Sequence, residues 1–240
     1  MKQSITIIHK TPLIFQVELS QQISVIVPGT SLELVDTSED GEIGKDSVDI
    51  ATVHLRGITH RGVWILLFNA NKTHILFVRR SNSTVICAGA WNTIGEHTKI
   101  GESYQAAILR GLREELNIVE SDLLMLRPLG DLELFSLNHY SVRRFNRQWT
   151  QTYIGLLADD IVNFDPKETS AMQWVKSIDA VHWITSCDFD VTTGSCVPRT
   201  CTDSTNITIT NKRTAIVTAF GSYGDLLASK ILAALHFFSL

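Results

Sequence analysis

Two runs of β-branched, leucine and aromatic residues stand on either side of a short turn. The first run covers residues 62–69, the second covers residues 73–80, and residues 70–72 join them. Strand-forming runs separated by so short a connection are typical of antiparallel neighbours. We therefore expect a β-hairpin over residues 62–80.

Residues 103–117 show the period of an amphipathic helix. Four apolar side chains fall on one stripe of a helical wheel: Ile108, Leu109, Leu112 and Leu116. Arg110, Glu114 and Glu115 point away from this stripe. Because the apolar residues recur every three or four positions, the pattern predicts a helix with one buried and one charged face.

Shorter apolar segments predict the other elements. Strands are expected at residues 32–36, 129–137, 150–158 and 172–175, and helices near residues 177–184 and over residues 223–240. Strands on both sides of a central helix indicate an α+β fold, in which a mixed β-sheet is sandwiched between α-helices. The last helix is expected to cover the core, and a homodimer interface is its alternative use.

The predicted elements also suggest a domain organisation. Residues 1–31 contain β-prone runs at 4–8 and 23–27, and we interpret them as an N-terminal β extension. Residues 32–240 are expected to form a single domain. Within that domain, residues 186–214 are rich in Ser, Thr, Cys, Asp and Gly and lack a helical period, which predicts an inserted loop or hairpin.

The composition excludes several classes of protein. The chain has 240 residues, of which 44% are hydrophobic, and its 21 basic and 25 acidic side chains give a net charge of −4. This balance favours a globular protein and gives no electrostatic reason to expect nucleic acid or a membrane surface as a partner. No apolar run approaches the roughly 20 residues that span a bilayer, and no secretory signal is evident, so we expect a cytoplasmic protein.

Four cysteines do not indicate a disulfide scaffold in a chain of this length. Three of them, Cys187, Cys196 and Cys201, follow no familiar zinc-binding spacing. We therefore expect neither a disulfide framework nor a structural zinc site.

The predicted helix follows a glycine-bearing loop, and loop and helix together offer a way to hold a cation. The loop covers residues 95–102, and the charged face of the helix carries adjacent carboxylates at Glu114 and Glu115. Carboxylate oxygens suit Mg²⁺, which keeps waters and substrate phosphates in its shell. The alternative is a solvated helix face, on which Arg110 and Glu114 form an i,i+4 pair contributing about 0.2–0.5 kcal/mol.

The loop and the helix together resemble the Nudix box, whose pattern is G-x5-E-x7-R-E-U-x-E-E-x-G-U with U apolar. Six positions match: Glu102, Arg110, Leu112, Glu114, Glu115 and Ile118. Three positions differ: Glu96 stands in place of the first Gly, Gly111 in place of the first Glu of R-E-U-x-E-E, and Asn117 in place of the last Gly.

This resemblance implies a Nudix fold and a hydrolase that uses Mg²⁺ or Mn²⁺ to cleave a diphosphate bond in a small organic or nucleoside diphosphate. It implies metal ligands at Glu115, Glu114, Glu102 and Glu96. Glu114, Glu115 and Arg110 are the expected catalytic residues, with Arg110 orienting the glutamates through charge-assisted hydrogen bonds.

Residues 32–184 are similar to the Nudix branch that contains isopentenyl-diphosphate isomerase and its hydrolase relatives. In those isomerases histidines and glutamates hold the metal, and His54, His60 and His97 lie at or within one residue of the histidine positions. They are expected to contribute to metal or substrate binding, with structural, hydrogen-bonded histidines as the alternative. The isomerase cysteine position holds Gly95, and residues 147–152 contain no acid, so we do not expect isomerase activity.

Gly111 bears directly on hydrolysis. Residues 111 and 115 lie one turn apart on the same helix face, so the usual pair of ligating carboxylates is reduced to Glu115. Glycine also costs a helix interior about 1 kcal/mol relative to alanine. Two interpretations remain open: a weakened Nudix-fold binding or regulatory module, or a rearranged site in which Glu96 or a histidine supplies the missing ligand.

One further segment interleaves basic and aromatic residues. Arg143, Arg144 and Arg147 lie in it, and they could grip the phosphates of the substrate. The alternative is an exposed hairpin tip.

Overall fold

The computed structural model describes residues 33–239, with gaps at 84–86, 140–142, 161, 168, 191, 202–205, 214–216 and 221–222. The strands of its first half are β1 Leu34–Thr37, β2 Asp46–Asp49, β3 Thr59–Phe68, β4 His74–Arg80, β5 Trp91–Asn92, β6 Ile94–His97 and β7 Leu123–Pro128. Those of its second half are β8 Glu133–His139, β9 Arg144–Leu157, β10 Thr169–Lys176, β11 Cys187–Asp190, β12 Ser195–Pro198, β13 Asn206–Asn211 and β14 Val217–Phe220. The α-helices are α1 Ile50–Arg56, α2 Tyr104–Leu116, α3 Ala180–Thr185 and α4 Tyr223–Phe238, and short 3₁₀ turns lie at Glu120–Asp122 and Ser177–Asp179.

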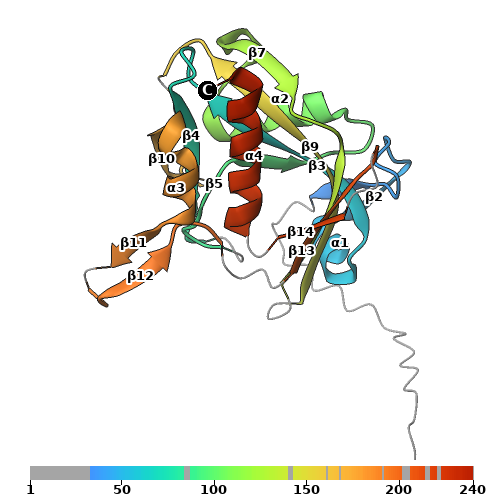
Figure 1. Ribbon diagram of the computed structural model, residues 1–240. Helices are drawn as coiled ribbons and strands as arrows, with labels where there is room; N and C mark the ends of the chain where they lie inside the picture. The colour runs from blue at the N-terminus through green and yellow to red at the C-terminus, as the bar shows by residue number, and fades with distance from the viewer. Residues whose placement is uncertain are drawn as a thin grey trace, which may run out of the picture. The chain divides into compact units, whose positions relative to one another are not determined.

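Twelve of the described strands join one mixed sheet, whose main path has the order β10-β4-β3-β9-β8-β13-β14 (Figure 1). β1, β2, β5, β6 and β7 pair with this sheet off the main path. β3 and β9 run parallel, from the pair Thr59 and Arg147 to the pair Phe68 and Leu156. The other neighbours along this path are antiparallel. The expected hairpin is confirmed, since β3 and β4 pair next to their connecting turn.

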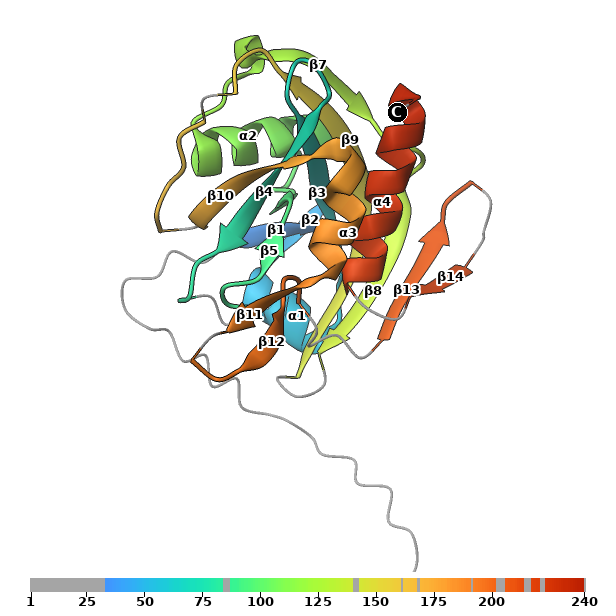
Figure 2. The same cartoon turned by 60° about the vertical axis from the view of Figure 1, so that its left-hand side comes forward.

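Helices cover both faces of this sheet (Figure 2). Ile108, Leu112 and Leu116 of α2 pack in one buried cluster with inward side chains of β3 and β4. Leu227 and Ile231 of α4 belong to a second cluster, which also contains residues of α3 and the opposite side chains of the same strands. The expected α+β sandwich is therefore confirmed.

The central helix begins and ends close to the expected positions. Ser103 caps its start, because the side-chain oxygen accepts a hydrogen bond from the backbone N–H of Ala106 (3.1 Å). Asn117 ends it in the left-handed conformation with φ 54° and donates its N–H to the carbonyls of Arg113 and Leu112. Asparagine tolerates this conformation better than most residues, so the departure from the last Gly of the box leaves the helix end intact.

One strand was expected in the wrong place. Residues 129–132 lie in a turn, where Gly130 has a φ of 70°, and β8 begins only at Glu133. The preceding strand β7, which pairs with β9, was not expected. The apolar residues near Leu129 suggested one continuous strand, but Pro128 and Gly130 break the run.

The segment 186–214 contains two kinds of structure. β11 and β12 form a separate two-stranded hairpin, as the sequence suggested. β13 instead pairs along its whole length with β8, so it belongs to the main sheet. Alternating isoleucine and threonine in β13 fit a strand with one buried face.

The structure pairs the four cysteines, contrary to expectation. Disulfides join Cys87 to Cys201 and Cys187 to Cys196, with Cα atoms 5.1 and 5.6 Å apart. Both separations are normal for a disulfide. The first bond joins residues 114 positions apart, so the cysteine spacing could not reveal it.

The predicted β extension, with its runs at 4–8 and 23–27, lies outside the described residues. Within the described part of the chain, no helix is long and apolar enough to cross a membrane.

Candidate active site

Arg110, in the middle of α2, gathers three carboxylates where β6 and its following loop meet the helix. Its guanidinium donates hydrogen bonds to Glu102 (3.0 and 3.2 Å), Glu96 (2.9 Å) and Glu114 (3.2 Å). It also donates to the backbone carbonyl of His97 (2.6 Å). Since charge-assisted hydrogen bonds are strong, one arginine ties the strand, the loop and the helix together.

Burial and neighbouring charges have opposite effects on the pKa values of Arg110 and Glu96. Burial opposes the charge on Arg110, but the hydrogen bonds and charges of Glu102 and Glu96 outweigh it and raise the pKa of the guanidinium. Burial also raises the pKa of the Glu96 carboxyl, against the opposing effect of Arg110. Glu96 is thus a partly desolvated acid that depends on a positive partner for its charge.

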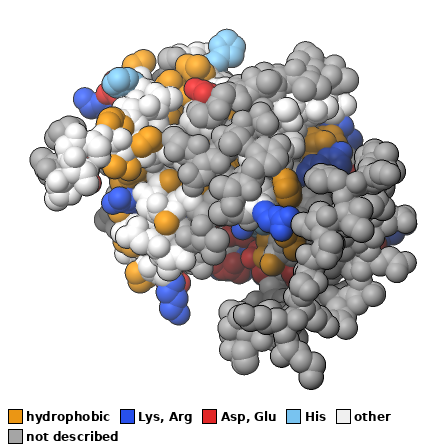
Figure 3. Space-filling view, turned by 90° about the horizontal axis from the view of Figure 1, so that it is seen from below, with side chains coloured by type: hydrophobic (Ala, Val, Ile, Leu, Met, Phe, Trp, Pro, Cys, Tyr) orange, Lys and Arg blue, Asp and Glu red, His pale blue; other side chains and the backbone are white. Residues whose placement is uncertain are grey.

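A cavity of about 580 Å³ opens beside the cluster, a size common for small-ligand sites. Its lining includes acids, arginines and aromatic rings, among them Glu33, Glu96, Glu115, Arg80, Arg144 and Trp64. Figure 3 shows acidic side chains beside basic and hydrophobic ones on the face seen from below. Glu115 therefore shares one cavity with Glu96, whereas Glu102 and Glu114 reach the cluster through Arg110.

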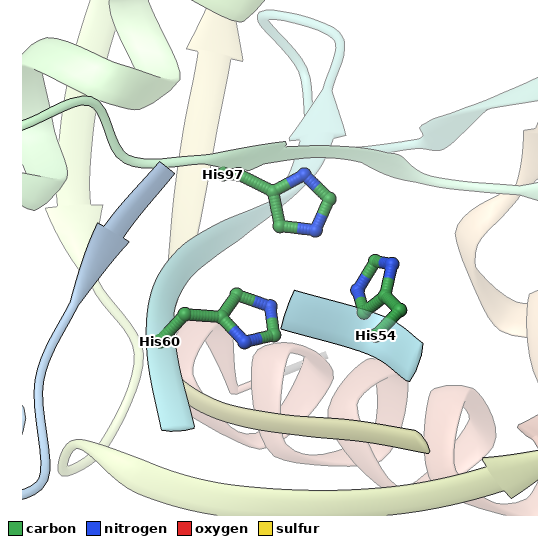
Figure 4. A group of neighbouring side chains, drawn as sticks. All are labelled: His54, His60 and His97. Atoms are coloured by element: carbon green, nitrogen blue, oxygen red, sulfur yellow. The ribbon is translucent and has the colours of Figure 1, made fainter. Parts of the chain in front are cut away.

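Three histidines from three elements meet next to this cavity (Figure 4). Their ring centroids lie 5.2 to 5.4 Å apart, and one nitrogen from each lies within 4.8 Å of the others. His54 comes from α1, His60 from β3 and His97 from β6. Three imidazoles at this separation could hold a metal ion, so the structure brings together the three histidines that the sequence singled out.

The chain folds sharply to place His54 and His60 together. The Asp49 side chain caps the start of α1 by accepting from the N–H of Thr52 (2.9 Å). Gly57 ends the helix with a φ of 65° and turns the chain into β3. A left-handed residue is needed there, and glycine takes it without strain.

His60 has a defined neutral form. Its Nδ1 lies 3.0 Å from the carbonyl of Ile58, and because a carbonyl only accepts, this nitrogen carries the proton. Burial, and then the charge of His97, lower the pKa of His60 to about 3. The ring is therefore neutral at neutral pH, and its Nε2 offers a lone pair of the kind that binds metals.

Glu33 was not expected in the site. Its Oε1 lies 3.6 Å from Nδ1 of His97, and both residues line the cavity. The interaction with His97 lowers the pKa of the Glu33 carboxyl, although partial burial opposes it. Glu33 lies just before β1, 64 positions from its partner in the chain, so no local pattern could have identified it.

The space beside Gly95 is filled by the indole of Trp64. A Cβ atom at residue 95 would lie 2.6 Å from Cδ1 and 3.0 Å from Nε1 of Trp64. Trp64 itself stacks on Phe135 at 5.0 Å and packs edge-on against Tyr223 at 5.5 Å. The position at which the isomerases carry a cysteine therefore has no room for a side chain.

The space beside Gly111 is filled in the same way by Glu96. A Cβ atom at residue 111 would lie 2.3 Å from Cγ of Glu96 and 3.2 Å from its Cδ and Oε1. The absence of a side chain at residue 111 therefore makes room for a carboxylate that comes from β6.

A buried ion pair holds the loop that carries Glu102. Arg61 of β3 donates to Asp36 of β1 (2.6 Å) and to the backbone carbonyl of Glu102 (3.0 Å). Its guanidinium also lies over the ring of Tyr104, 4.2 Å from the centroid. The hydroxyl of Tyr104 donates to the carbonyl of Gly41 (2.8 Å), so the start of α2 is fixed against the rest of the domain.

The three arginines predicted to grip phosphate have different positions. Arg144 lines the cavity, where burial and then the charge of Arg80 lower the pKa of its guanidinium. Arg147 is half exposed and lies 3.9 Å from Glu39, outside the cavity lining. Arg143 is an exposed turn residue with a φ of 51°. Of these three arginines, Arg144 alone shares the cavity with Glu96 and Glu115.

A mixed sheet between helices, with an arginine-centred carboxylate cluster at a loop–helix junction, defines the class of this α+β protein. The chain belongs to the Nudix family, because the family model described as NUDIX domain matches residues 58–189.

Two curated relatives are isomerases by name. An isopentenyl-diphosphate Delta-isomerase 2 of Photorhabdus laumondii is 30% identical over 151 residues, 60% of this chain and 76% of the relative. An isopentenyl-diphosphate Delta-isomerase of Serratia proteamaculans is 30% identical over 155 residues, 58% of this chain and 84% of the relative. Among solved structures, DR0079 from Deinococcus radiodurans aligns with a TM-score of 0.49 and 21% identity, covering 69% of this chain and 93% of that one.

Proposed function

We propose that this chain is a Nudix-type hydrolase that cleaves the diphosphate bond of a small organic or nucleoside diphosphate, with Mg²⁺ or Mn²⁺. The observation that carries the proposal is the carboxylate cluster around Arg110, which borders a cavity that also contains Arg80 and Arg144. Acids for a cation and arginines for phosphate oxygens are the two groups that a bound diphosphate requires.

The residues present fit a hard divalent cation. The donors are carboxylate oxygens, which Mg²⁺ and Mn²⁺ prefer. The side chain of Glu96 occupies the space next to Gly111. Glu115 and Glu96 would hold the cation, with Glu114 and Glu102 as further oxygen donors. When bound, the cation would neutralise diphosphate charge and lower the pKa of a coordinated water.

The arginines of the site would position the carboxylates and the substrate. Arg110 holds Glu96, Glu102 and Glu114 in place through charge-assisted hydrogen bonds. Arg144 and Arg80 would pair with phosphate oxygens and orient the substrate. In the reaction, the oxygen of water would bond to one phosphorus while the bridging P–O bond breaks, and the displaced phosphate would keep the bridging oxygen. The proton that the water loses would pass to the displaced phosphate or to solvent. One water is consumed and two phosphate-bearing products leave.

The three histidines offer a second cation site. Imidazole nitrogens suit Zn²⁺, Fe²⁺ or Ni²⁺ better than Mg²⁺. We propose that His54, His60 and His97 bind such an ion beside the diphosphate, with Glu33 next to His97.

A binding or regulatory module is the second candidate function. It is favoured by Gly111, which removes one carboxylate of the box from the helix. We do not propose isomerase activity, although both curated relatives bear that name, because Trp64 occupies the space in front of Gly95.

The test is a substrate panel. The purified chain is incubated with nucleoside diphosphate derivatives, prenyl diphosphates and diphosphoinositols, with and without Mg²⁺, and the phosphate products are quantified. We expect Mg²⁺-dependent turnover of at least one class, and loss of that turnover in Glu115→Gln. Binding of a panel member without turnover would contradict hydrolysis and support the binding module.

A further inference from the structure

Glu96 and Gly111 both depart from the Nudix box, and the two departures are complementary. The box has a glycine at the position of residue 96 and a glutamate at the position of residue 111. This chain has the reverse, a glutamate at residue 96 and a glycine at residue 111. We propose that the two residues are an exchanged pair: the carboxylate that the box places on the helix at residue 111 is supplied by Glu96 from β6. This inference rests on the proposed function, because it assigns a ligand to the same cation.

The geometry makes the two side chains mutually exclusive. A Cβ atom at residue 111 would lie 2.3 Å from Cγ of Glu96, and real Cβ atoms essentially never approach another atom within 3.0 Å. The contact atom is in the middle of the Glu96 side chain, so a shift of the carboxylate alone could not relieve it. A glutamate at residue 111 therefore requires the removal or displacement of the glutamate at residue 96.

The carboxylate of Glu96 also lies where a ligand from residue 111 is needed. Its Oε1 would be 3.2 Å from a Cβ atom at residue 111, so it lies over the helix face that residue 111 shares with Glu115 one turn later. Glu96 and Glu115 line the same cavity. Arg110 donates to the other oxygen, Oε2, and so holds the carboxyl group in this orientation.

The exchange explains why the helix has a glycine at residue 111 despite the loss of helix stability that glycine causes. Glycine in a helix interior costs about 1 kcal/mol relative to alanine. At residue 111 no larger residue fits while Glu96 is present. The number of carboxylates near the helix face is therefore conserved, and the site is rearranged rather than reduced.

The experiment is a set of swaps read out by Mg²⁺ binding, measured by titration calorimetry. Mg²⁺ is the probe because it prefers oxygen donors and therefore reports on the carboxylates and not on the three histidines. The set is wild type, Glu96→Gln, Glu96→Gly, Gly111→Glu, and the double variants Glu96→Gly with Gly111→Glu and Glu96→Gly with Gly111→Ala. Glu120→Gln, an exposed acid after the helix, is the matched control. Thermal melts of the metal-free proteins identify any variant that fails to fold.

We expect Glu96→Gln and Glu96→Gly to weaken Mg²⁺ binding by at least about tenfold, because the loss of a residue that only supports a metal ligand already costs about ten- to hundredfold. Gly111→Glu alone is expected to lower the melting temperature. The double variant with glutamate at residue 111 is expected to regain binding to within about threefold of wild type, a difference of about 0.7 kcal/mol. The double variant with alanine is expected to regain stability but not binding.

Two results would overturn the exchange. One is a wild-type affinity in Glu96→Gln, and the other is equal Mg²⁺ binding by the glutamate and alanine double variants. Either result would leave the hydrolase proposal standing, with Glu115 as the ligand. No Mg²⁺ binding by the wild-type chain would instead contradict the metal site of the proposed function itself.

Discussion

At the level of single residues, Gly95 and Gly111 each leave a space in the candidate site that a neighbouring side chain fills. Gly95 stands at the cysteine position of the isomerases, and Gly111 stands at a glutamate position of the Nudix box. From the sequence alone, each glycine is a missing functional side chain. The structure shows a large side chain in each space, Trp64 beside Gly95 and Glu96 beside Gly111. The sequence could show that both side chains are missing, but not which residues fill the two spaces. Trp64 comes from the neighbouring strand β3, and Glu96 comes from β6, 15 positions before Gly111 in the chain.

Gly95→Cys tests the first of these contacts. We expect it to lower the free energy of unfolding by about 1–3 kcal/mol, as overpacking of a core does, because the new Cβ atom would lie 2.6 Å from the indole of Trp64. Combining it with Trp64→Ala is expected to remove the clash but not to create isomerase activity. Denaturant unfolding gives the stabilities, and an unchanged midpoint for Gly95→Cys would contradict the packing described.

Arg144→Ala tests the predicted phosphate contact. The arginine lines the cavity, so its removal is expected to raise KM about tenfold, the equivalent of about 1.4 kcal/mol, with a small change in kcat. Arg147→Ala is the matched control, because that side chain lies outside the cavity lining and is half exposed. Steady-state kinetics on the best panel substrate measure both. Equal effects of the two substitutions would refute a specific role for Arg144.

At the element scale, local periodicity predicted the parts of the fold that are regular over many residues. The β3–β4 hairpin follows from two strand-forming runs joined by a short turn, and α2 follows from the 3.6-residue period. Ser103 and Asn117 bound the helix close to the expected positions. β7 was missed because Pro128 and Gly130 divide one apolar stretch into two strands. The three histidines were singled out from a resemblance, but their approach to within 4.8 Å depends on the turn at Gly57 and on β3–β6 pairing, which no local pattern encodes.

Asp36→Ala tests how β1, β3 and the start of α2 are tied together. Removing one partner of a buried ion pair leaves Arg61 uncompensated, so we expect a loss of about 3–5 kcal/mol in the free energy of unfolding. Tyr104→Phe removes the hydrogen bond to Gly41 but keeps the aromatic ring beside Arg61, and it is expected to cost about 1 kcal/mol. Chemical denaturation compares them, and a smaller loss for Asp36→Ala than for Tyr104→Phe would show that the pair does not fix the loop.

The histidine cluster makes a separate prediction for metals. We expect the metal-free chain to bind one Zn²⁺ per molecule at the cluster, and His97→Ala to weaken that binding at least tenfold, which corresponds to about 1.4 kcal/mol. His236→Ala, at the exposed end of α4, serves as the control. Competition with a zinc indicator measures the affinities. Unchanged affinity in His97→Ala would show that the three histidines are structural.

For the molecule as a whole, the two disulfides are a feature that the composition did not suggest. Cys87–Cys201 connects the loop after β4 to the segment after β12, and both residues line the cavity. Disulfides persist mainly in oxidising compartments. The cytoplasmic location therefore stays a prediction, and the two disulfides count against it.

Replacing the disulfides one at a time separates their contributions. Cys87→Ser with Cys201→Ser opens a loop of 114 residues and is expected to lower the free energy of unfolding by about 2–5 kcal/mol. Cys187→Ser with Cys196→Ser opens a loop of only nine residues in a peripheral hairpin and is expected to cost less. Denaturant midpoints test the order. The reverse order, or four titratable thiols in the unreduced chain, would contradict this pairing.

A crystal of the chain soaked with Mn²⁺ and a non-hydrolysable diphosphate shows directly whether Glu96 and Glu115 bind the cation together. We expect an anomalous peak at a coordination distance of about 2.1 Å from carboxylate oxygens of both residues. We also expect the diphosphate to lie between this ion and Arg144. A map with no peak at these two carboxylates, or with Mn²⁺ bound only by the three histidines, would contradict the proposed cation site.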